Sequence, residues 1–199
     1  MEPAHRTDPP PVAEAPGPDP AFVGRLVAVR PEPSAEGEPP TAADLDAILA
    51  VATTVPDHGD LTPWRFVVCS GAGRDRFAGD EVPEAVVAKM RSKAHAAPCS
   101  VVLVASPDPS SNVEVWEQVA SASCTGYAIV LAATGLGYGA VWKSAPVLGA
   151  GPVRDLFGCT PDETLLGWVN IGTPAPLGRK GLVHGSGVDL DGRVLRLDG

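Results

Sequence analysis

Residues 119–142 read VASASCTGYAIVLAATGLGYGAVW and contain no charged side chain. A stretch this long and uncharged raises the question of a membrane span. Its composition argues against one, because most of its residues are Ala, Gly, Ser or Thr and no basic cluster flanks it. Gly135, Gly137 and Gly139 would also end a helix near its last third. We therefore predict a buried helix of a soluble protein, from about Val113 to Leu136.

The predicted helix needs more cover than one copy of the chain provides. The chain has 199 residues, a length that suits one domain with a tail. A helix that is apolar on all sides must be covered all round, and its small side chains permit another helix to approach closely. A second copy of the chain would supply that cover, so the sequence favours a homodimer.

The net charge and the cysteines exclude several classes of protein. Lys and Arg total 15 against 24 Asp and Glu, a formal charge of −9, which argues against binding to nucleic acid or to an anionic membrane surface. No cysteines form a CxxC pair, and the four histidines share no ligand spacing with them, so we expect no metal site. Isolated cysteines in apolar runs indicate reduced core thiols of a cytoplasmic protein. These cysteines are Cys69, Cys99, Cys124 and Cys159.

The first part of the chain differs in composition from the rest. Half of the 22 prolines lie in residues 1–40. We predict that residues 1–20 form a disordered Pro-rich tail, because they cannot bury enough apolar surface to offset the cost of ordering. Residues 21–199 would then form the folded domain. The N-terminus has neither the basic nor the apolar region of a secretion signal.

Hydrophobic periodicity and turn residues predict the remaining elements. The first helix begins after the N-cap Thr41 and stops before Pro56. Further helices are expected at residues 81–97 and 153–157, strands at 64–69, 99–105, 139–144 and 165–171, and an Asp-Gly turn within 188–195.

Two stretches carry residues suited to ligand binding. The loop Pro56–Trp64 offers a histidine, two carboxylates, a hydroxyl and a tryptophan, although for the loop taken alone a plain turn beside a core tryptophan is the favoured interpretation. In the segment 135–144, Lys143 and Ser144 would donate to a phosphate or a reduced ring, or the segment is a glycine-rich helix exit. It is no dinucleotide fingerprint, because the helix precedes the glycines.

Taken in order, several segments resemble the nitroreductase family, specifically the small bacterial NAD(P)H nitroreductases. The resemblance covers residues 41–174. It rests on Pro56-Asp57-His58, Pro63-Trp64-Arg65-Phe66, Trp116-Glu117-Gln118, Gly137 to Ser144, Val153 to Cys159 and Gly167 to Pro174.

The resemblance implies an α+β fold with a mostly antiparallel sheet flanked by helices, and an intertwined homodimer. It further implies FMN bound between the subunits, with FAD as an alternative, and NAD(P)H as electron donor. Hydride would pass through flavin N5 to a small-molecule acceptor, such as a nitro compound, a quinone or a specialised metabolite. The protein would bind and orient the flavin, which performs the redox chemistry.

The same resemblance assigns flavin contacts to particular residues. Thr54 and His58 would contact the flavin from one subunit, and Trp142, Lys143 and Ser144 from the other. Residues 132–137 match the stretch that holds NAD(P) in such proteins.

The chain departs from the family at the flavin phosphate. Where relatives carry Arg-Arg-Ser, this chain has Arg25-Leu26-Val27, so Arg25 and Val27 occupy the phosphate-binding positions without the hydroxyl. Lys143 replaces an arginine, which costs bidentate geometry. Arg179 and Lys180 would compensate for the lost contacts. The altered phosphate site leaves a second hypothesis open, a non-catalytic protein that stores or sequesters flavin.

Overall fold

The protein is described here from a computed structural model. The described residues are 19–27, 30–77, 88, 90–93, 95–144, 146–149, 151–176, 193–195 and 197. In chain order the elements are α1 (Pro20–Val27), α2 (Ala42–Ala52), β1 (Trp64–Ser70), the 3-10 helix η1 (Gly71–Phe77), β2 (Cys99–Ala105), α4 (Val115–Gly135), β3 (Gly139–Lys143), the 3-10 helix η2 (Pro146–Gly149), α5 (Gly151–Leu156) and β4 (Thr164–Gly172).

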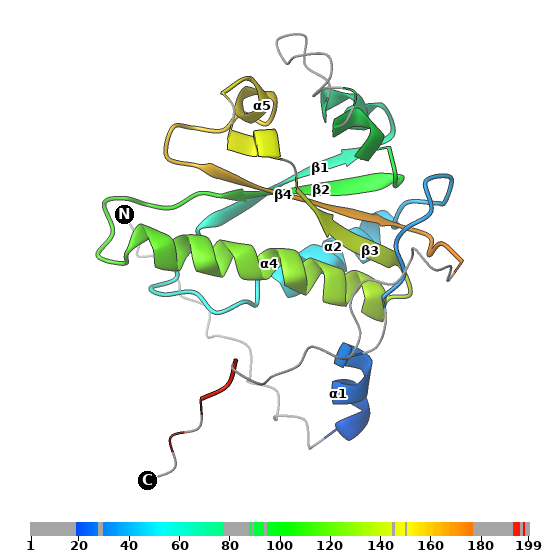
Figure 1. Ribbon diagram of the computed structural model, residues 1–199, viewed down its shortest axis with the longest axis horizontal. Helices are drawn as coiled ribbons and strands as arrows, with labels where there is room; N and C mark the ends of the chain where they lie inside the picture. Colours follow the sequence, from blue (N-terminus) through cyan, green and yellow to red (C-terminus); the bar gives the residue numbers. More distant parts are fainter. Residues whose placement is uncertain are drawn as a thin grey trace, which may run out of the picture.

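A four-stranded sheet in the order β1-β2-β4-β3 forms the middle layer (Figure 1). Every neighbouring pair of strands is antiparallel. Helices α2 and α4 lie on one face of the sheet, and α5 lies on the other (Figure 1). The α+β fold with an antiparallel sheet flanked by helices is therefore confirmed.

Both faces of the sheet are buried, and each strand contributes side chains to both faces because successive side chains point in opposite directions. All seven residues of β2 are buried. Val101 and Leu103 pack with residues of α2 and α4, whereas Val102 and Val104 pack on the opposite face with α5. A central strand with apolar residues at nearly every position is the signature of a sheet covered on both sides.

The long helix that the uncharged stretch predicts is present as α4. It crosses β2, β3 and β4 and packs against α2. Its own chain does not cover it all round, since Trp116 is 68% exposed and Ala120, Cys124 and Tyr127 are also exposed. Within the described residues, no helix has the length and hydropathy that a membrane span needs.

The other expected elements agree with the structure to within a few residues. Thr41 caps α2 as predicted, its hydroxyl oxygen accepting a hydrogen bond from the Asp44 amide at 3.1 Å. Of the helix expected at 81–97, residues 88 and 90–93 are described and helical, and a turn follows at residue 95. The tail at residues 1–18 and most of the predicted turn in 188–195 lie outside the described residues.

The cysteine prediction was wrong for one residue. Cys69 and Cys99 are buried, and burial raises the pKa of the Cys99 thiol to about 11. Cys124 is exposed, because its position on α4 faces away from the sheet. None of the four cysteines forms a disulfide bond.

A bulge at Gly167 brings β4 unusually close to β3. The register between β2 and β4 shifts there, because Leu103 pairs with Gly167 and Val104 with Leu165. Gly167 has a φ of 127°, and a Cβ at this position would lie 2.4 Å from the carbonyl oxygen of Lys143. Only glycine satisfies both constraints.

Replacing Gly167 by alanine should therefore destabilise the protein by roughly 2–4 kcal/mol, the sum of backbone strain and overpacking. Urea unfolding monitored by tryptophan fluorescence would measure the change. Gly149→Ala is the matched control, because nothing lies within 4 Å of the added Cβ. Equal stabilities of the two variants would contradict the proposed close approach.

Candidate functional site

The loop after α2 forms one wall of an open cavity of about 450 Å³. His58 is 75% exposed, and its Nδ1 lies 3.1 Å from Oε2 of Glu117 on α4. The Ser121 hydroxyl donates to the carbonyl of Pro56 at 2.6 Å, which fixes the start of the loop against α4. The residues that line this cavity are Pro56, Asp57, His58, Trp116, Glu117, Ala120, Ser121 and Cys124.

The loop itself has an unusual backbone. Asp60 and Thr62 have φ angles of 52° and 46°, in the left-handed region that a β-branched residue such as threonine rarely adopts. The Thr62 amide donates to Oδ2 of Asp57 at 2.7 Å, which holds this conformation. Strained loops of this kind concentrate at ligand sites.

Trp142 and Lys143 lie at the sheet edge, where two glycines make room for the indole. A Cβ at Gly126 of α4 would lie 2.9 Å from Cζ3 of Trp142, and one at Gly167 would lie 2.8 Å from its Nε1. The Lys143 ammonium forms an ion pair with Glu32 at 2.9 Å. The indole is thus held between α4 and β4, and the lysine is tied to the segment before α2.

Residues 30–33, before α2, form an extended piece of chain beside β3. The amide of Ala140 donates to the carbonyl of Pro31 at 3.1 Å, and Pro33 forms an isolated bridge with Pro174. Glu32 contacts β3 and Arg30 contacts α4 through Tyr127, whose hydroxyl accepts from Nη2 at 3.2 Å.

A second cavity, of about 480 Å³, lies between α1 and the end of α4. Arg25 and Arg30 line it together with mostly apolar residues, and part of the predicted NAD(P) stretch forms its far wall. The lining residues are Phe22, Arg25, Leu26, Arg30, Val51, Leu131, Ala132, Thr134 and Gly135. Arg25 itself is exposed and pairs with Asp19 at 3.1 Å.

The residues assigned from the sequence do not all come together in one copy of the chain. His58 contacts α4 at Glu117, whereas Trp142 contacts it at Gly126. With a rise of 1.5 Å per residue, these positions are about 14 Å apart along the helix. Thr54 is exposed beyond α2, where its hydroxyl donates to the carbonyl of Val51 at 2.8 Å.

Some of the residues assigned from the sequence are not described at either cavity. Val27 ends α1, but its side chain lies outside the description, and so do Arg179 and Lys180. Ser144 is exposed after β3, and its carbonyl accepts from Nζ of Lys93 at 2.7 Å.

Sequence reasoning missed Glu117 as the partner of His58 and Lys93 as the partner of Ser144. Both partners are far from their contacts in the sequence, so no local spacing reveals them. Sequence reasoning also missed the near-complete burial of Arg30, because no sequence pattern indicates it.

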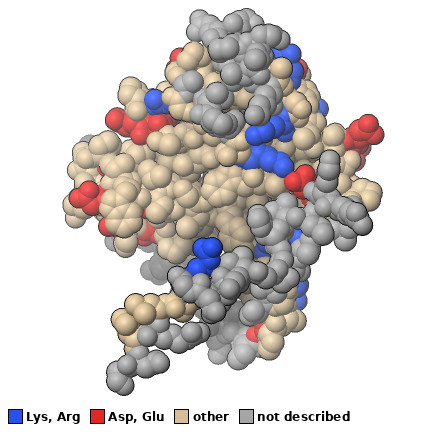
Figure 2. All heavy atoms as spheres, viewed as in Figure 1, with Lys and Arg blue, Asp and Glu red and all other residues tan. Residues whose placement is uncertain are grey.

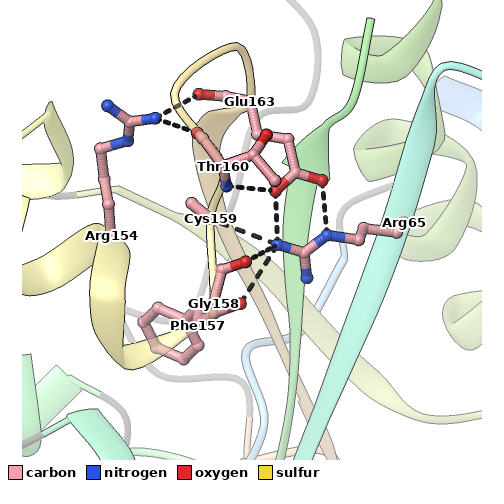
Figure 3. Close-up of polar contacts among 7 residues, drawn as sticks. All are labelled: Arg65, Arg154, Phe157, Gly158, Cys159, Thr160 and Glu163. Carbon is pink, nitrogen blue, oxygen red and sulfur yellow. Dashed lines mark hydrogen bonds and ion pairs between the residues drawn. The ribbon is translucent and has the colours of Figure 1, made fainter.

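Arg65, although part of the Pro-Trp-Arg-Phe segment, is a structural residue (Figure 3). Its Nε and Nη2 donate to the two carboxylate oxygens of Glu163 at 2.7 and 2.8 Å. Nη2 also donates to the carbonyls of Phe157 and Gly158 at 3.1 and 3.2 Å. Arg154 donates to the carbonyl of Glu163 at 3.1 Å, so the two arginines fasten the turn between α5 and β4 from both sides.

The Arg65 hydrogen bonds lower the pKa of Glu163 from 4.5 to about 2, against the opposing effect of burial. The carboxylate is only 7% exposed. A depressed pKa means that the stabilisation is complete above the unfolded value of about 4.5 and is lost as the pH falls towards 2.

Glu163→Gln should therefore cost about 2–3 kcal/mol of unfolding free energy at pH 7, and the cost should shrink between pH 4.5 and pH 2. Urea unfolding of both proteins across that range would measure the difference. Asp162→Asn is a neighbouring control on an exposed carboxylate. A cost that stays constant down to pH 2 would refute the charge-based explanation.

The surface agrees with an uncovered face on α4. Figure 2 shows a broad band of uncharged side chains across the middle of the molecule, where Figure 1 places this helix. Acidic side chains lie towards the margins of the same view. The chain carries a formal charge of −9, so this band differs from the average composition of the surface.

Comparison with known proteins identifies the family. The model of the nitroreductase family matches residues 36–173. The chain is 34% identical over 143 residues to the Escherichia coli (strain K12) protein named "Putative NAD(P)H nitroreductase YdjA", covering 68% of this chain and 78% of that protein. A Haemophilus influenzae protein of the corresponding name is 32% identical over 143 residues, covering 67% and 78% of the two chains.

Solved structures support the fold. A nitroreductase-like family protein from Bacillus cereus matches with a TM-score of 0.76 and 20% identity, over 93% of this chain and 100% of that one. A nitroreductase with bound FMN from Bacteroides fragilis matches with a TM-score of 0.60 and 17% identity, over 89% and 98%. This chain belongs to the nitroreductase family. The resemblance noted in the sequence is confirmed.

The described residues are chemically suited to FMN. The cavity beside α1 joins an apolar wall to two guanidinium groups, as a ligand with an aromatic ring and a phosphate requires. Its volume of about 480 Å³ lies within the range of small-molecule sites. Trp142 on β3 adds a partly exposed aromatic surface, and Lys143 adds a further cation.

Proposed function

We propose that this protein is an FMN-dependent NAD(P)H oxidoreductase that works as a homodimer, with FAD as an alternative flavin. Its electron acceptor would be a small molecule such as a nitro compound, a quinone or a specialised metabolite. The family supports the chemistry, and the uncovered face of α4 between two cavities is the observation that supports the arrangement.

The positions of the two cavities support the proposed homodimer. One cavity borders the first turns of α4 near Trp116, and the other borders its last turns near Leu131. Two copies of α4 that pair antiparallel about a two-fold axis would bring the start of one helix beside the end of the other. The His58 loop of one copy would then adjoin the Arg25 and Trp142 region of its partner.

When bound, FMN would accept a hydride from the nicotinamide cofactor and pass electrons to the acceptor. The chain would supply orientation and charge. Glu117 holds the His58 ring at the cavity rim, Trp142 offers an aromatic surface fixed between two glycines, and Lys143 brings a cation to the sheet edge. The four free thiols suit a reducing compartment such as the cytoplasm.

Two features favour the alternative, a flavin-binding protein without turnover. The Lys143 ammonium already pairs with Glu32, so part of the charge that would stabilise a reduced, anionic ring is neutralised. The hydroxyl expected at position 27 is also replaced by valine. Both features are consistent with binding flavin without tuning it for reduction.

Freshly purified protein should be yellow, and mass spectrometry of the released ligand should identify FMN. Anaerobic NAD(P)H should bleach the flavin absorbance, and a nitroarene or quinone should restore it. Lys143→Ala should weaken FMN binding roughly tenfold through loss of a charged hydrogen bond, with the exposed Arg91→Ala as control. Bound flavin that NAD(P)H never bleaches would favour storage, and a protein that binds no flavin would contradict both functions.

The dimer contact has a separate test. Ala120→Arg places a charged side chain on the exposed face of α4 and should convert the dimer to a monomer in light scattering coupled to size-exclusion chromatography. Ala47→Arg, on an exposed position of α2, is the matched control and should remain dimeric. A wild-type monomer, or an unaffected Ala120→Arg dimer, would overturn this arrangement.

A further inference from the structure

A histidine and a carboxylate from different elements meet at the wall of the first cavity. Nδ1 of His58 lies 3.1 Å from Oε2 of Glu117, and both residues line the cavity of about 450 Å³. The carboxylate therefore occupies one nitrogen of the ring. The other nitrogen, Nε2, has no partner among the described residues and is the one that remains for a ligand.

The loop that carries His58 is held on both sides of that residue. Before it, the Ser121 hydroxyl donates to the carbonyl of Pro56 at 2.6 Å. After it, the amide of Thr62 donates to Oδ2 of Asp57 at 2.7 Å. The imidazole is nevertheless 75% exposed, so water reaches it. A ring that is fixed in position and open to solvent is suited to repeated proton transfer.

The other lining residues indicate the class of ligand. Trp116 is 68% exposed and offers a flat apolar surface, and Pro56 and Ala120 add apolar walls. Asp57 and Glu117 also line the cavity, whereas no lysine or arginine does so among the described residues. A neutral aromatic acceptor therefore suits these walls better than an anionic one.

We propose that this cavity binds a quinone and that His58 donates the proton that completes its reduction, with Glu117 as the positioning residue. The inference rests on the proposed function, because the hydride comes from the reduced flavin. That hydride brings two electrons to the quinone and forms one O–H bond. The Nε2–H bond of the protonated His58 then breaks, and the second O–H bond forms. The flavin is oxidised, the quinone is reduced to a hydroquinone, and the neutral ring takes its next proton from water.

Glu117 keeps the ring in one arrangement throughout this cycle. In a protonated imidazole both nitrogens are donors, so Nδ1 donates to the carboxylate while Nε2 serves the acceptor. After the transfer, Nδ1 retains its proton beside Glu117, and Nε2 is the nitrogen that water protonates again. A carboxylate that holds one nitrogen in this way makes a histidine act as acid or base through the other.

The test separates an acceptor that needs protons from one that does not. Duroquinone gains a proton on each oxygen, whereas ferricyanide accepts electrons alone. Reoxidation of the reduced flavin by each acceptor is followed by stopped-flow absorbance, with the full chain kept loaded by excess FMN. His58→Gln should slow the reaction with duroquinone about 100-fold, as loss of a general acid predicts, and should leave the reaction with ferricyanide unchanged.

The chain provides a matched control pair outside this cavity. His95 lies 3.0 Å from Asp75 and lines no part of the cavity. His95→Gln should therefore preserve the rates with both acceptors. Glu117→Gln covers the case in which His58→Gln fails to fold, and it should slow the reaction with duroquinone by a smaller factor without affecting that with ferricyanide.

The pH profile and the solvent isotope effect assign the proton to the histidine. The wild-type rate with duroquinone should fall as the pH rises and should be lower in D₂O. The other titratable groups that line the cavity are Asp57, Glu117 and Cys124. Both effects should disappear in His58→Gln, in which those three groups are unchanged.

Nitrogen-15 NMR of the oxidised protein gives a readout that does not depend on turnover. In the neutral ring of His58 the proton should reside on Nδ1, beside Glu117. In Glu117→Gln it should be shared between the two ring nitrogens, while the signals of His95 remain as they are. An unchanged proton position in Glu117→Gln would show that the carboxylate does not position the ring.

The outcomes distinguish this inference from the proposed function. Equal slowing with both acceptors in His58→Gln, or no slowing with duroquinone, would overturn the inference and leave the proposed function intact. Wild-type protein that reduces neither acceptor would contradict the proposed function, and the inference with it.

Discussion

The close approach of three elements around Trp142 is the constraint on which the candidate site depends. The indole on β3 occupies space that only glycines leave open, Gly126 on α4 and Gly167 on β4. The bulge at Gly167 adds a backbone contact to Lys143 that a side chain would block. Because the helix and both strands meet there, any change in their packing would move the aromatic surface and the neighbouring cation together.

Polar contacts connect the residues before α2 to β3 and α4. Glu32 pairs with Lys143, and Arg30 contacts Tyr127 one residue after Gly126. Elsewhere, the Arg65–Glu163 pair holds the turn between α5 and β4 without touching either cavity. The ion pair that stabilises this turn is therefore separate in space from the charged side chains near the uncovered helix.

Much of the fold could be predicted from the sequence, because its signals are local. The uncharged run predicts α4, and Thr41 predicts the start of α2. The site was less accessible, since its geometry depends on long-range packing. The burial of Arg30, the pairing of His58 with Glu117 and the exposure of Cys124 each follow from how elements meet, and no spacing in the sequence encodes them.

The extended piece beside β3 divides the N-terminal region into parts with different tolerance to changes in length. Arg30 contacts Tyr127 of α4, and Glu32 pairs with Lys143 of β3. Inserting or deleting a residue between Arg30 and Pro33 would displace at least one of these side chains from its contact. Residues 34–38 are held as well, because the amides of Ser34 and Glu38 donate to the carbonyl and the hydroxyl of Thr173 at 2.7 and 3.0 Å. Natural variation in loop length should therefore fall outside residues 30–38.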